Sequence, residues 1–280
     1  MSGRLILCAT PIGNLEDVTQ RSLRLLAEAD VVACEDTRRT RKLLSHHGVQ
    51  TRRLVVYNEG NERRRAPALV QKMLAGDTVL LVSDAGMPGL SDPGYRLVRA
   101  AVDAGVVVAV APGPTAAISA LAISGLPPAR FVFEGFLPRK AGDRRRRLEE
   151  LRDEERTLVF YESPHRVLDC LDDLYELFGD RPAAVVRELT KVHEEVRRGS
   201  LEQLRDKARE VPPRGEIVLV VGGALRRDRI ADPEELAAAA RALMSEGLQR
   251  KAALQQVARE AGVPKRAVFD ALVEPEEPEV

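Results

Sequence analysis

Cysteine is scarce in this sequence, and long apolar segments are absent from it. The 280 residues include three cysteines, Cys8, Cys34 and Cys170, at wide spacings. An odd number without paired spacing argues against a disulfide framework and a zinc site, so we expect reduced thiols and no bound metal. The apolar run before Pro11 is too short for a signal peptide, and no other run approaches the length of a membrane span. We therefore expect a soluble, cytoplasmic protein.

An excess of charge and the common nucleotide-binding motifs are also missing. Lysine and arginine together number 43, as do aspartate and glutamate, so the net charge is zero. Zero net charge leaves nucleic-acid binding open, because such binding depends on where basic residues cluster. The basic clusters lie at 38–42, 63–65 and 144–147. Neither G-x-G-x-x-G nor G-x-x-x-x-G-K-[ST] occurs, which disfavours dinucleotide and P-loop sites.

What is present is a regular alternation of apolar and amphipathic segments. Strand-like runs lie at 5–9, 31–35, 54–57, 78–82 and 106–110. Helix-like segments lie between them at 19–29, 37–47, 62–75 and 95–104. This order predicts an α/β fold with parallel strands and helices on both faces. The unbroken β-branched run at 106–110 is typical of a strand that is buried on both faces.

A second α/β region follows the sequence GLPP at 125–128. Its strand-like runs lie at 131–136, 157–162, 183–190, 194–199 and 217–221, with helices expected at 143–155, 166–178 and 201–211. The two consecutive runs within 183–199 predict an antiparallel pair and hence a mixed sheet. We therefore expect four parts: an α/β domain at 1–125, a second at 126–224, a helical appendage at 232–273 and an acidic, disordered tail at 274–280.

The loops that follow the first-half strands contain many glycine, proline and polar residues. They lie at 10–14, 35–38, 83–94 and 112–117. Ligands of open parallel sheets bind beyond the carboxyl ends of the strands, and glycine lets a ligand approach the main chain. Each loop alone is also consistent with a simple tight turn. Because all four are expected at one edge of the sheet, together they predict a binding site there.

The C-terminal segment LQRKAALQQVAREAGVPKRAVFDALV, residues 248–273, predicts a helix–turn–helix. Its turn contains Gly262, and Pro264 opens the second helix. This shape is common in nucleic-acid-binding proteins, and Arg250, Lys251, Lys265 and Arg266 add positive charge. Two short amphipathic helices also often simply pack together, so both interpretations stay open.

Six longer motifs carry a resemblance to a known family. They are ATPIGNLEDVTQRSLRLLAEADVVACEDTRRTRKLL, VSDAGMPGLSDPG, VVAVAPGPTAAISALAISGLP, FEGFLPRK, FYESPHR and RELTKVHEEVRRG. Together, from about residue 4 to about 223, they resemble the ribosomal-RNA-modifying members of the tetrapyrrole (corrin/porphyrin) methylase superfamily, the class III methyltransferases. The resemblance implies two α/β domains with S-adenosyl-L-methionine folded between them, a homodimer and a helix–turn–helix appendage. It also implies 2′-O-methylation of a cytidine ribose in 16S rRNA of the 30S subunit, near the decoding centre.

The resemblance also implies roles for individual residues. The residues expected to bind the cofactor are Pro11, Asp84, Ala85, Gly86, Met87, Pro88, Pro112, Gly113, Thr115, Ala116, Tyr161, Glu162 and Ser163. A ribose hydroxyl is a poor nucleophile, and Glu35, Asp36 and Lys191 are the candidates for its general base. The residues expected to bind RNA are Arg38, Arg39, Arg41, Lys42, Lys265 and Arg266.

Two other functions remain possible from the sequence. The first is methylation of a small acceptor, such as a tetrapyrrole or an elongation-factor side chain, on the same scaffold. It predicts an apolar trough at the site, whereas an RNA-modifying enzyme should have basic side chains there. The second is a helix–turn–helix regulator that senses a small ligand and transfers no methyl group.

Overall fold

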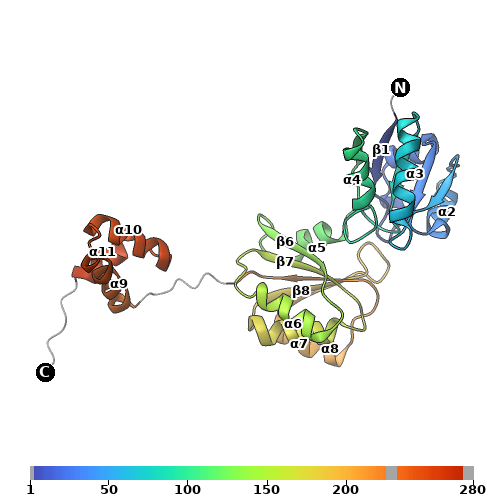
Figure 1. Ribbon diagram of the computed structural model, residues 1–280. Coiled ribbons are helices and arrows are strands. Elements are labelled where there is room, and N and C mark those ends of the chain that lie inside the picture. Colours follow the sequence, from blue (N-terminus) through green and yellow to red (C-terminus); the bar gives the residue numbers. More distant parts are fainter. Residues whose placement is uncertain (1–2, 225–231, 274–280) are drawn as a thin grey trace. The chain divides into compact units, whose positions relative to one another are not determined.

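The computed structural model describes residues 3–224 and 232–273 (Figure 1). The chain divides into two compact units, Met1–Gly223 and Ala224–Val280. The acidic tail expected at 274–280 lies outside the described residues. Among the described residues, no helix combines the length and the apolar character that crossing a membrane requires.

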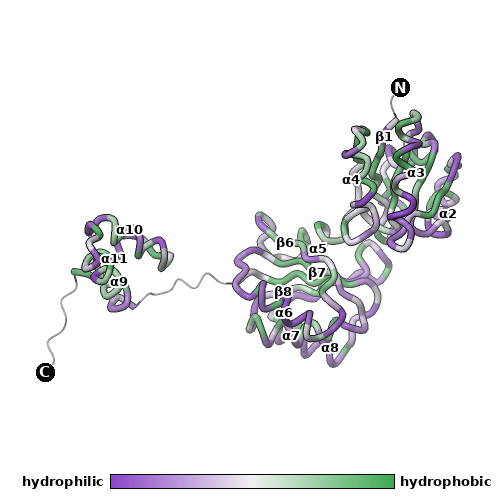
Figure 2. Tube along the Cα trace, in the orientation of Figure 1, coloured by the Kyte–Doolittle hydropathy of each residue, from purple (hydrophilic) through white to green (hydrophobic). Residues whose placement is uncertain are grey.

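The first sheet of the larger unit is entirely parallel, as predicted. Its strand order is β3-β2-β4-β1-β5. The strands are β1 (Arg4–Cys8), β2 (Val31–Cys34), β3 (Leu54–Val56), β4 (Thr78–Val82) and β5 (Val107–Ala111). Helices α1 (Gln20–Glu28) and α2 (Thr37–His46) pack on one face, after the short helix η1 (Leu15–Asp17). Helices α3 (Glu62–Leu74) and α4 (Tyr95–Asp103) pack on the other face. Hydrophobic residues are concentrated along these strands (Figure 2).

Strand β5 differs from the expectation that it would be buried on both faces. It is the edge strand of the sheet, with β1 as its neighbour. Val107 and Val110 are consequently 58% and 48% exposed. A continuous β-branched run therefore marks a strand here without guaranteeing two covered faces, because burial depends on the strand's place in the sheet.

Helix α5 (Ala116–Ser124) was not predicted from the sequence. Its sequence AAISALAIS is apolar on nearly every side, so it lacks the amphipathic stripe that identifies a surface helix. Its residues Ala117, Ala120 and Leu121 pack against Val159 and Val186 of the second sheet. The helix precedes the expected boundary at residue 125 but packs on the sheet beyond that boundary; the division into domains at 125 stays a prediction.

The second sheet is mixed, as predicted, in the order β6-β7-β10-β8-β9. Its strands are β6 (Phe131–Phe136), β7 (Thr157–Glu162), β8 (Pro182–Arg187), β9 (Glu195–Ser200) and β10 (Ile217–Val221). β6 and β7 are parallel, whereas β10 runs antiparallel to both β7 and β8, and β8 runs antiparallel to β9. Helices α6 (Ala141–Glu150), α7 (Val167–Phe178) and α8 (Leu201–Glu210) enclose the core on one face, and α5 covers the other.

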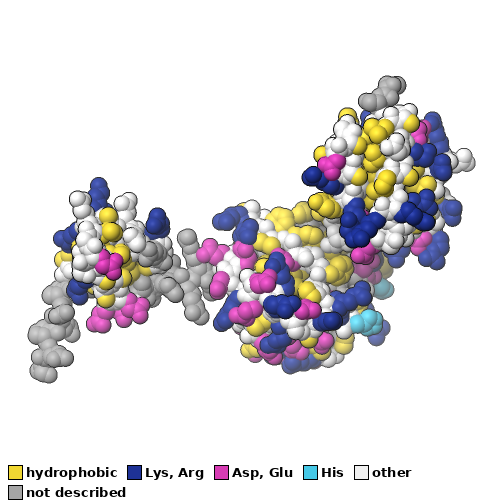
Figure 3. Space-filling model, viewed as in Figure 1, with side chains coloured by type: hydrophobic (Ala, Val, Ile, Leu, Met, Phe, Trp, Pro, Cys, Tyr) yellow, Lys and Arg dark blue, Asp and Glu magenta, His cyan; other side chains and the backbone are white. Residues whose placement is uncertain are grey.

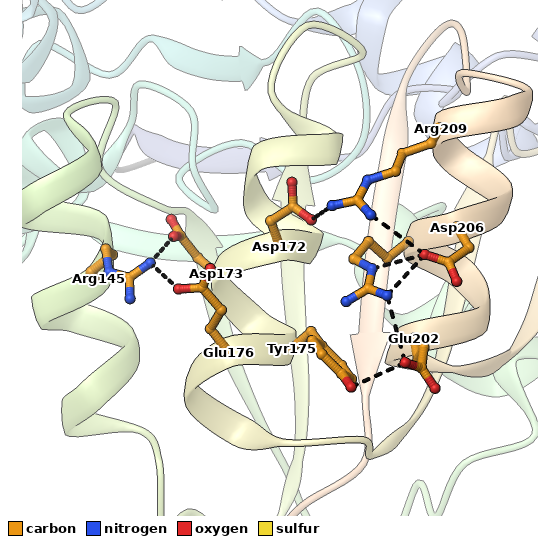
Figure 4. A network of polar contacts seen from close by, with 9 residues as sticks. Arg145, Asp172, Asp173, Tyr175, Glu176, Glu202, Asp206 and Arg209 are labelled. Atoms are coloured by element: carbon orange, nitrogen blue, oxygen red, sulfur yellow. Dashed lines mark hydrogen bonds and ion pairs between the residues drawn. The ribbon is translucent and has the colours of Figure 1, made fainter.

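Ion pairs join the helices of this face to one another (Figure 4). Arg145 of α6 pairs with both Asp173 and Glu176 of α7 at 2.7 and 2.6 Å. Arg209 of α8 pairs with Asp172 of α7 at 2.6 Å. Below the surface, the buried Arg144 guanidinium lies 2.6 Å from the Asp173 carboxylate. The arginine-rich segment 144–147 therefore has a structural role in packing α6.

The smaller unit is a bundle of three helices: α9 (Pro233–Ser245), α10 (Arg250–Ala261) and α11 (Lys265–Val273). Leu236, Ala240, Leu254, Val257 and Val268 form its core. Gly262, at φ 69°, ends α10 in the left-handed conformation and begins the predicted turn. The structure thus contains the helix pair expected at 248–273 and places a third helix against it.

Candidate functional site

A cavity of about 290 Å³ lies within the larger unit, where the carboxyl ends of first-sheet strands meet residues of the second sheet. It is lined by Ile12, Glu35, Arg39, Asp84, Ala85, Gly86, Met87, Leu90, Ser91, Asp92, Thr115, Ala116, Phe136, Tyr161, Glu162, Val186, Leu189, Glu216, Ile217 and Val218. The loops after β1, β2, β4 and β5 all contribute main-chain or side-chain atoms to this wall. The cavity therefore lies at the edge of the sheet where the sequence predicts a site.

The loop after β4 is held to the loop after β1 by main-chain hydrogen bonds. The Thr10 N–H donates to the Gly86 carbonyl at 2.9 Å, and the Gly86 N–H donates to the Thr10 carbonyl at 3.0 Å. The Ser83 hydroxyl lies 3.2 Å from the carbonyl oxygens of both Ala85 and Gly86. Gly86 has φ 80°, a conformation that side-chain-bearing residues rarely adopt. This local geometry fixes the main chain of residues 84–87 in the cavity wall.

The far end of the same loop packs closely on the second sheet. Ser91 is a non-glycine residue at φ 63°, and Gly135 lies at a bulge in β6. A Cβ atom at Gly135 would lie 2.7 Å from the Ser91 Oγ, so the side chain of Ser91 occupies the space that glycine leaves. Asp92, the next residue, lines the cavity. Strained backbone of this kind is common at functional sites.

Carboxylates dominate the charge of the cavity. Burial raises the pKa of Asp92 to about 6, and the neighbouring charges of Glu35 and Asp84 add to that rise, whereas hydrogen bonding to Ser83 opposes it. Burial and the charge of Asp84 likewise raise the pKa of Glu35. Arg39 partly balances these charges from 3.4 Å away from the Asp84 carboxylate. A crowded set of carboxylates is suited to binding a cationic ligand or to accepting a proton.

Glu162 supplies a further carboxylate from the end of β7. Its side chain is 1% exposed and lies 3.2 Å from the Arg166 guanidinium. One of its oxygens accepts the Ser163 N–H at 2.8 Å. Arg166 also donates to the carbonyl oxygen of Leu137 at 2.8 Å, which links the loops after β6 and β7. The motif FYESPHR therefore contributes Tyr161 and Glu162 to the cavity wall, and the half-buried Arg166 pairs with the buried Glu162.

The three candidate bases from the sequence lie in different surroundings. Glu35 lines the cavity. Asp36 instead caps α2 by accepting the Arg38 N–H at 2.8 Å, and hydrogen bonds from Arg38 lower its pKa to about 2. Lys191 is not among the residues that line the cavity.

The ammonium of Lys191 contacts two carboxylates, Glu188 at 2.9 Å and Glu216 at 3.1 Å. Burial alone would lower the pKa of Lys191, but the hydrogen bonds to these carboxylates outweigh it and raise the pKa. The Lys191 Cγ packs so closely on Gly13 that a Cβ there would lie 2.6 Å away. Lys191 therefore joins the loop after β8 to the loop after β1 as a charged group, which does not suit a general base.

The expected cofactor residues also divide into two groups. Those that line the cavity are Asp84, Ala85, Gly86, Met87, Thr115, Ala116, Tyr161 and Glu162. Those that do not are Pro11, Pro88, Pro112, Gly113 and Ser163. Gly113 packs closely on Ala9, because a Cβ at residue 113 would lie 2.9 Å from the Cβ of Ala9. Pro11 lines a second, neighbouring cavity.

The expected RNA-binding residues lie in both units. Arg38, Arg39, Arg41 and Lys42 are exposed on α2, although Arg38 is held by Asp36 at 2.6 Å. Lys265 and Arg266 are exposed on α11 of the smaller unit, where Arg266 lies 3.7 Å from Asp270.

Sequence reasoning missed Asp92, Phe136 and Glu216 among the cavity residues. Asp92 lies in the same glycine- and proline-rich stretch as Asp84, and Phe136 lies in the motif FEGFLPRK. Both segments were recognised, so the signal was present but did not single out these side chains. Within the described residues, no group of three or more histidine, cysteine or acidic side chains could hold a metal ion.

The fold and the family match place this chain among the methyltransferases of the tetrapyrrole methylase type. Residues 4–205 match the family Tetrapyrrole (Corrin/Porphyrin) Methylases, and the chain belongs to this family. The predicted membership is confirmed.

Two curated relatives are similar to this chain over nearly its whole length. Ribosomal RNA small subunit methyltransferase I of Halalkalibacterium halodurans is 46% identical over 275 residues, covering 96% of this chain and 94% of that protein. The protein of the same name from Mycobacterium tuberculosis is 49% identical over 276 residues, covering 98% and 95%. A solved structure of uroporphyrin-III C-methyltransferase from Thermus thermophilus, complexed with S-adenosylhomocysteine, is 22% identical with a TM-score of 0.56, covering 80% of this chain and 99% of that one. The last similarity establishes the shared fold.

Proposed function

We propose that this protein transfers a methyl group from S-adenosyl-L-methionine to the ribosomal RNA of the small subunit. The observation that carries the proposal is the similarity of 46–49% to relatives named ribosomal RNA small subunit methyltransferase I, over nearly the whole of both chains. We propose further that the acceptor is the 2′-hydroxyl of a cytidine in 16S rRNA, reached in the 30S subunit. Such an acceptor implies a cytoplasmic protein.

The residues of the cavity fit this cofactor. S-adenosyl-L-methionine carries a sulfonium and an ammonium cation, and the wall contains Glu35, Asp84 and Asp92. Opposite charges attract more strongly in a partly buried site than in water. The main chain of residues 84–87 offers amides and carbonyls at a place where Gly86 leaves room for a ligand. We propose that these residues, with Thr115 and Tyr161, hold the cofactor.

The cofactor supplies the methyl group, and the residues of the chain position the acceptor and take its proton. Orientation of a hydroxyl oxygen toward a reacting carbon can contribute about 7–11 kcal/mol. We propose that the carboxylate of Asp92, whose pKa is raised to about 6, accepts the hydroxyl proton, next to Glu35, whose pKa is also raised. A base with a pKa near the working pH suits this task better than Asp36, whose pKa is about 2.

We also propose that the protein is a homodimer. Tyr95, Val102 and Val107 are 73%, 55% and 58% exposed at the β5 edge and the adjoining helix α4. Exposed apolar side chains on an edge strand and the helix beside it favour pairing with another chain. Sedimentation equilibrium would measure the mass; a Val107→Lys variant should dissociate a dimer that uses this edge.

The experiment that tests the main proposal combines purified protein, tritiated S-adenosyl-L-methionine and 30S subunits that lack the modification. Label on a cytidine ribose of the 16S rRNA is the expected result. Label on a tetrapyrrole or on protein alone would instead favour the small-acceptor alternative. Nucleic-acid binding without methyl transfer, retained after removal of residues 1–125, would favour the regulator. Calorimetry should detect binding of the demethylated cofactor; absence of heat would contradict the cavity assignment.

A further inference from the structure

A second cavity, of about 250 Å³, adjoins the first. It is lined by Thr10, Pro11, Gly13, Leu15, Arg39, Thr40, Lys42, Leu43, Ser83 and Asp84. Arg39 and Asp84 line both cavities, so these two side chains form the wall between them. A group held in the second cavity is therefore separated from the first by the side chains of one ion pair.

The charge of the second cavity differs from that of the first. Its charged lining residues are Arg39, Lys42 and Asp84. Lys42 is exposed and, within the described part of the chain, has no carboxylate at ion-pair distance. Arg39 is 62% exposed and its contact with Asp84 is long at 3.4 Å; such exposed pairs contribute little and leave the cation available to a ligand. The net positive charge favours an anion.

The neutral polar groups of this cavity are already engaged. The Thr10 hydroxyl donates to the Ser83 carbonyl at 3.2 Å, and the Thr40 hydroxyl donates to the Asp36 carbonyl at 3.2 Å. Arg39 and Lys42 therefore hold the side-chain hydrogen-bond donors of this cavity that remain free for a ligand. Lysine and arginine are the side chains that contact phosphate groups most often in nucleic-acid complexes.

More unpaired cations continue along the same edge of the sheet. Arg63, Arg64 and Arg65 lie in the first turns of α3, the helix after β3, and Arg41 precedes Lys42 on α2. All four are exposed, and the described residues place no carboxylate within ion-pair distance of them. Figure 3 shows Lys and Arg side chains gathered over this part of the larger unit. We define the basic edge as Arg39, Arg41, Lys42 and residues 63–65; of these, Arg39 and Lys42 line the second cavity.

We propose that the second cavity binds a backbone phosphate of the acceptor RNA, and that the basic edge binds the next phosphates along the strand. A phosphate held by Arg39 and Lys42 would bring the neighbouring ribose to the wall shared with the first cavity. This inference rests on the proposed function and adds the path by which the RNA strand reaches the first cavity.

Lys42→Gln and its control Lys72→Gln test the proposal. Lys72 lies in the last turn of α3, at the end remote from the basic edge, and pairs with Asp77. Glutamine keeps helix propensity similar to that of lysine, so both variants should fold. Fluorescence anisotropy would measure affinity for a short single-stranded RNA containing cytidine at several salt concentrations. Calorimetry would measure S-adenosylhomocysteine binding in parallel.

Lys42→Gln should bind the RNA about tenfold more weakly, with a salt slope smaller by about 0.7, while Lys72→Gln behaves as wild type. Binding of S-adenosylhomocysteine should be unchanged in both, because Lys42 does not line the first cavity. Inorganic phosphate should compete with RNA on the wild-type protein but less on Lys42→Gln. Equal RNA affinity and slope for wild type and Lys42→Gln would overturn the inference. A wild-type protein that binds no RNA would instead refute the proposed function.

Discussion

Two arginine-rich segments of the larger unit look alike in sequence and differ in the structure. Within 144–147, each arginine pairs with at least one carboxylate, and Arg144 is buried against Asp173. The arginines at 63–65 have no such partner among the described residues. Local charge density is therefore a poor guide to function. The carboxylates that the fold brings to an arginine decide whether it stabilises the protein or is left for a ligand.

The largest effect is expected from substitution of Arg144, the buried arginine of the paired segment 144–147. Arg144→Met removes one partner of Asp173, and a buried carboxylate that loses a partner costs about 3 kcal/mol of unfolding free energy. Urea denaturation would measure it. The control is Arg146→Met, whose pair with Asp143 is exposed and should contribute less than about 1 kcal/mol. Equal stability of the two variants would show that burial does not distinguish these arginines.

The carboxylates present the same contrast, because Asp173 lies between arginines whereas Asp92 faces other carboxylates. Asp92→Asn should lower methyl transfer at neutral pH by about a hundredfold if Asp92 accepts the proton. The wild-type rate should rise as pH passes about 6, the pKa of Asp92, and the variant should lose that rise. Steady-state rates between acidic and neutral pH would measure both.

Stability provides a second measurement on the same variant. The pKa of Asp92 is raised from 3.8, so the folded protein binds this proton more tightly than the unfolded chain does. The free energy of unfolding should therefore fall as pH rises from about 4 to about 6, because ionising the buried group is unfavourable. Asp92→Asn should lack this component. An identical pH dependence in wild type and variant would mean that Asp92 titrates normally.

Substitutions in the unpaired segment 63–65 should weaken RNA binding and leave the stability of the protein unchanged. Substitution of glutamine for Arg63, Arg64 and Arg65 together should weaken RNA binding at least tenfold and reduce the salt slope by about 2. The free energy of unfolding should change by less than about 0.5 kcal/mol, because these side chains are exposed. Anisotropy titrations and urea denaturation would measure the two quantities. A loss of stability without a change in RNA affinity would mean that these arginines stabilise the fold and do not bind RNA.

The smallest effect is expected in the smaller unit. Lys265→Gln with Arg266→Gln should weaken RNA binding about two- to threefold, because each exposed phosphate contact contributes modestly. Arg250 stacks on Phe269, 5.4 Å from the ring centre, so its charge is held on the same bundle. Affinity for 30S subunits would be measured, with Glu246→Gln as a control of opposite charge. No loss in the double variant would favour a packing role for this bundle.

Much of the fold followed from the sequence because its strands and helices have distinct periods. The parallel first sheet, the mixed second sheet and the helix pair at the C-terminus were all predicted correctly. Helix α5 was missed because AAISALAIS is apolar nearly all round and has no polar face to reveal the helical period. The exposure of β5 was missed because alternation and branching describe a strand but not its neighbours.

The candidate site was predictable as a place rather than as a set of side chains. Glycine- and proline-rich loops after parallel strands predicted a site at the edge of the sheet where the cavity lies, since the carboxyl ends of those strands meet there. The roles of Asp36 and Asp92 could not be separated in this way. Asp36 precedes α2 and is held by Arg38 of that helix, whereas Asp92 lines the cavity near Glu35 and Asp84.

The sequence by itself determined the family and most of the helices and strands, because these depend on local pattern and short motifs, and it predicted a site at the sheet edge where the cavity lies. The tertiary structure alone decided which charges are paired, which carboxylates share the cavity and that a basic cavity adjoins an acidic one. Electrostatic energies depend on distance and burial, and residues remote in the chain, such as Glu35 and Asp92, acquire their pKa values only when folding brings them together.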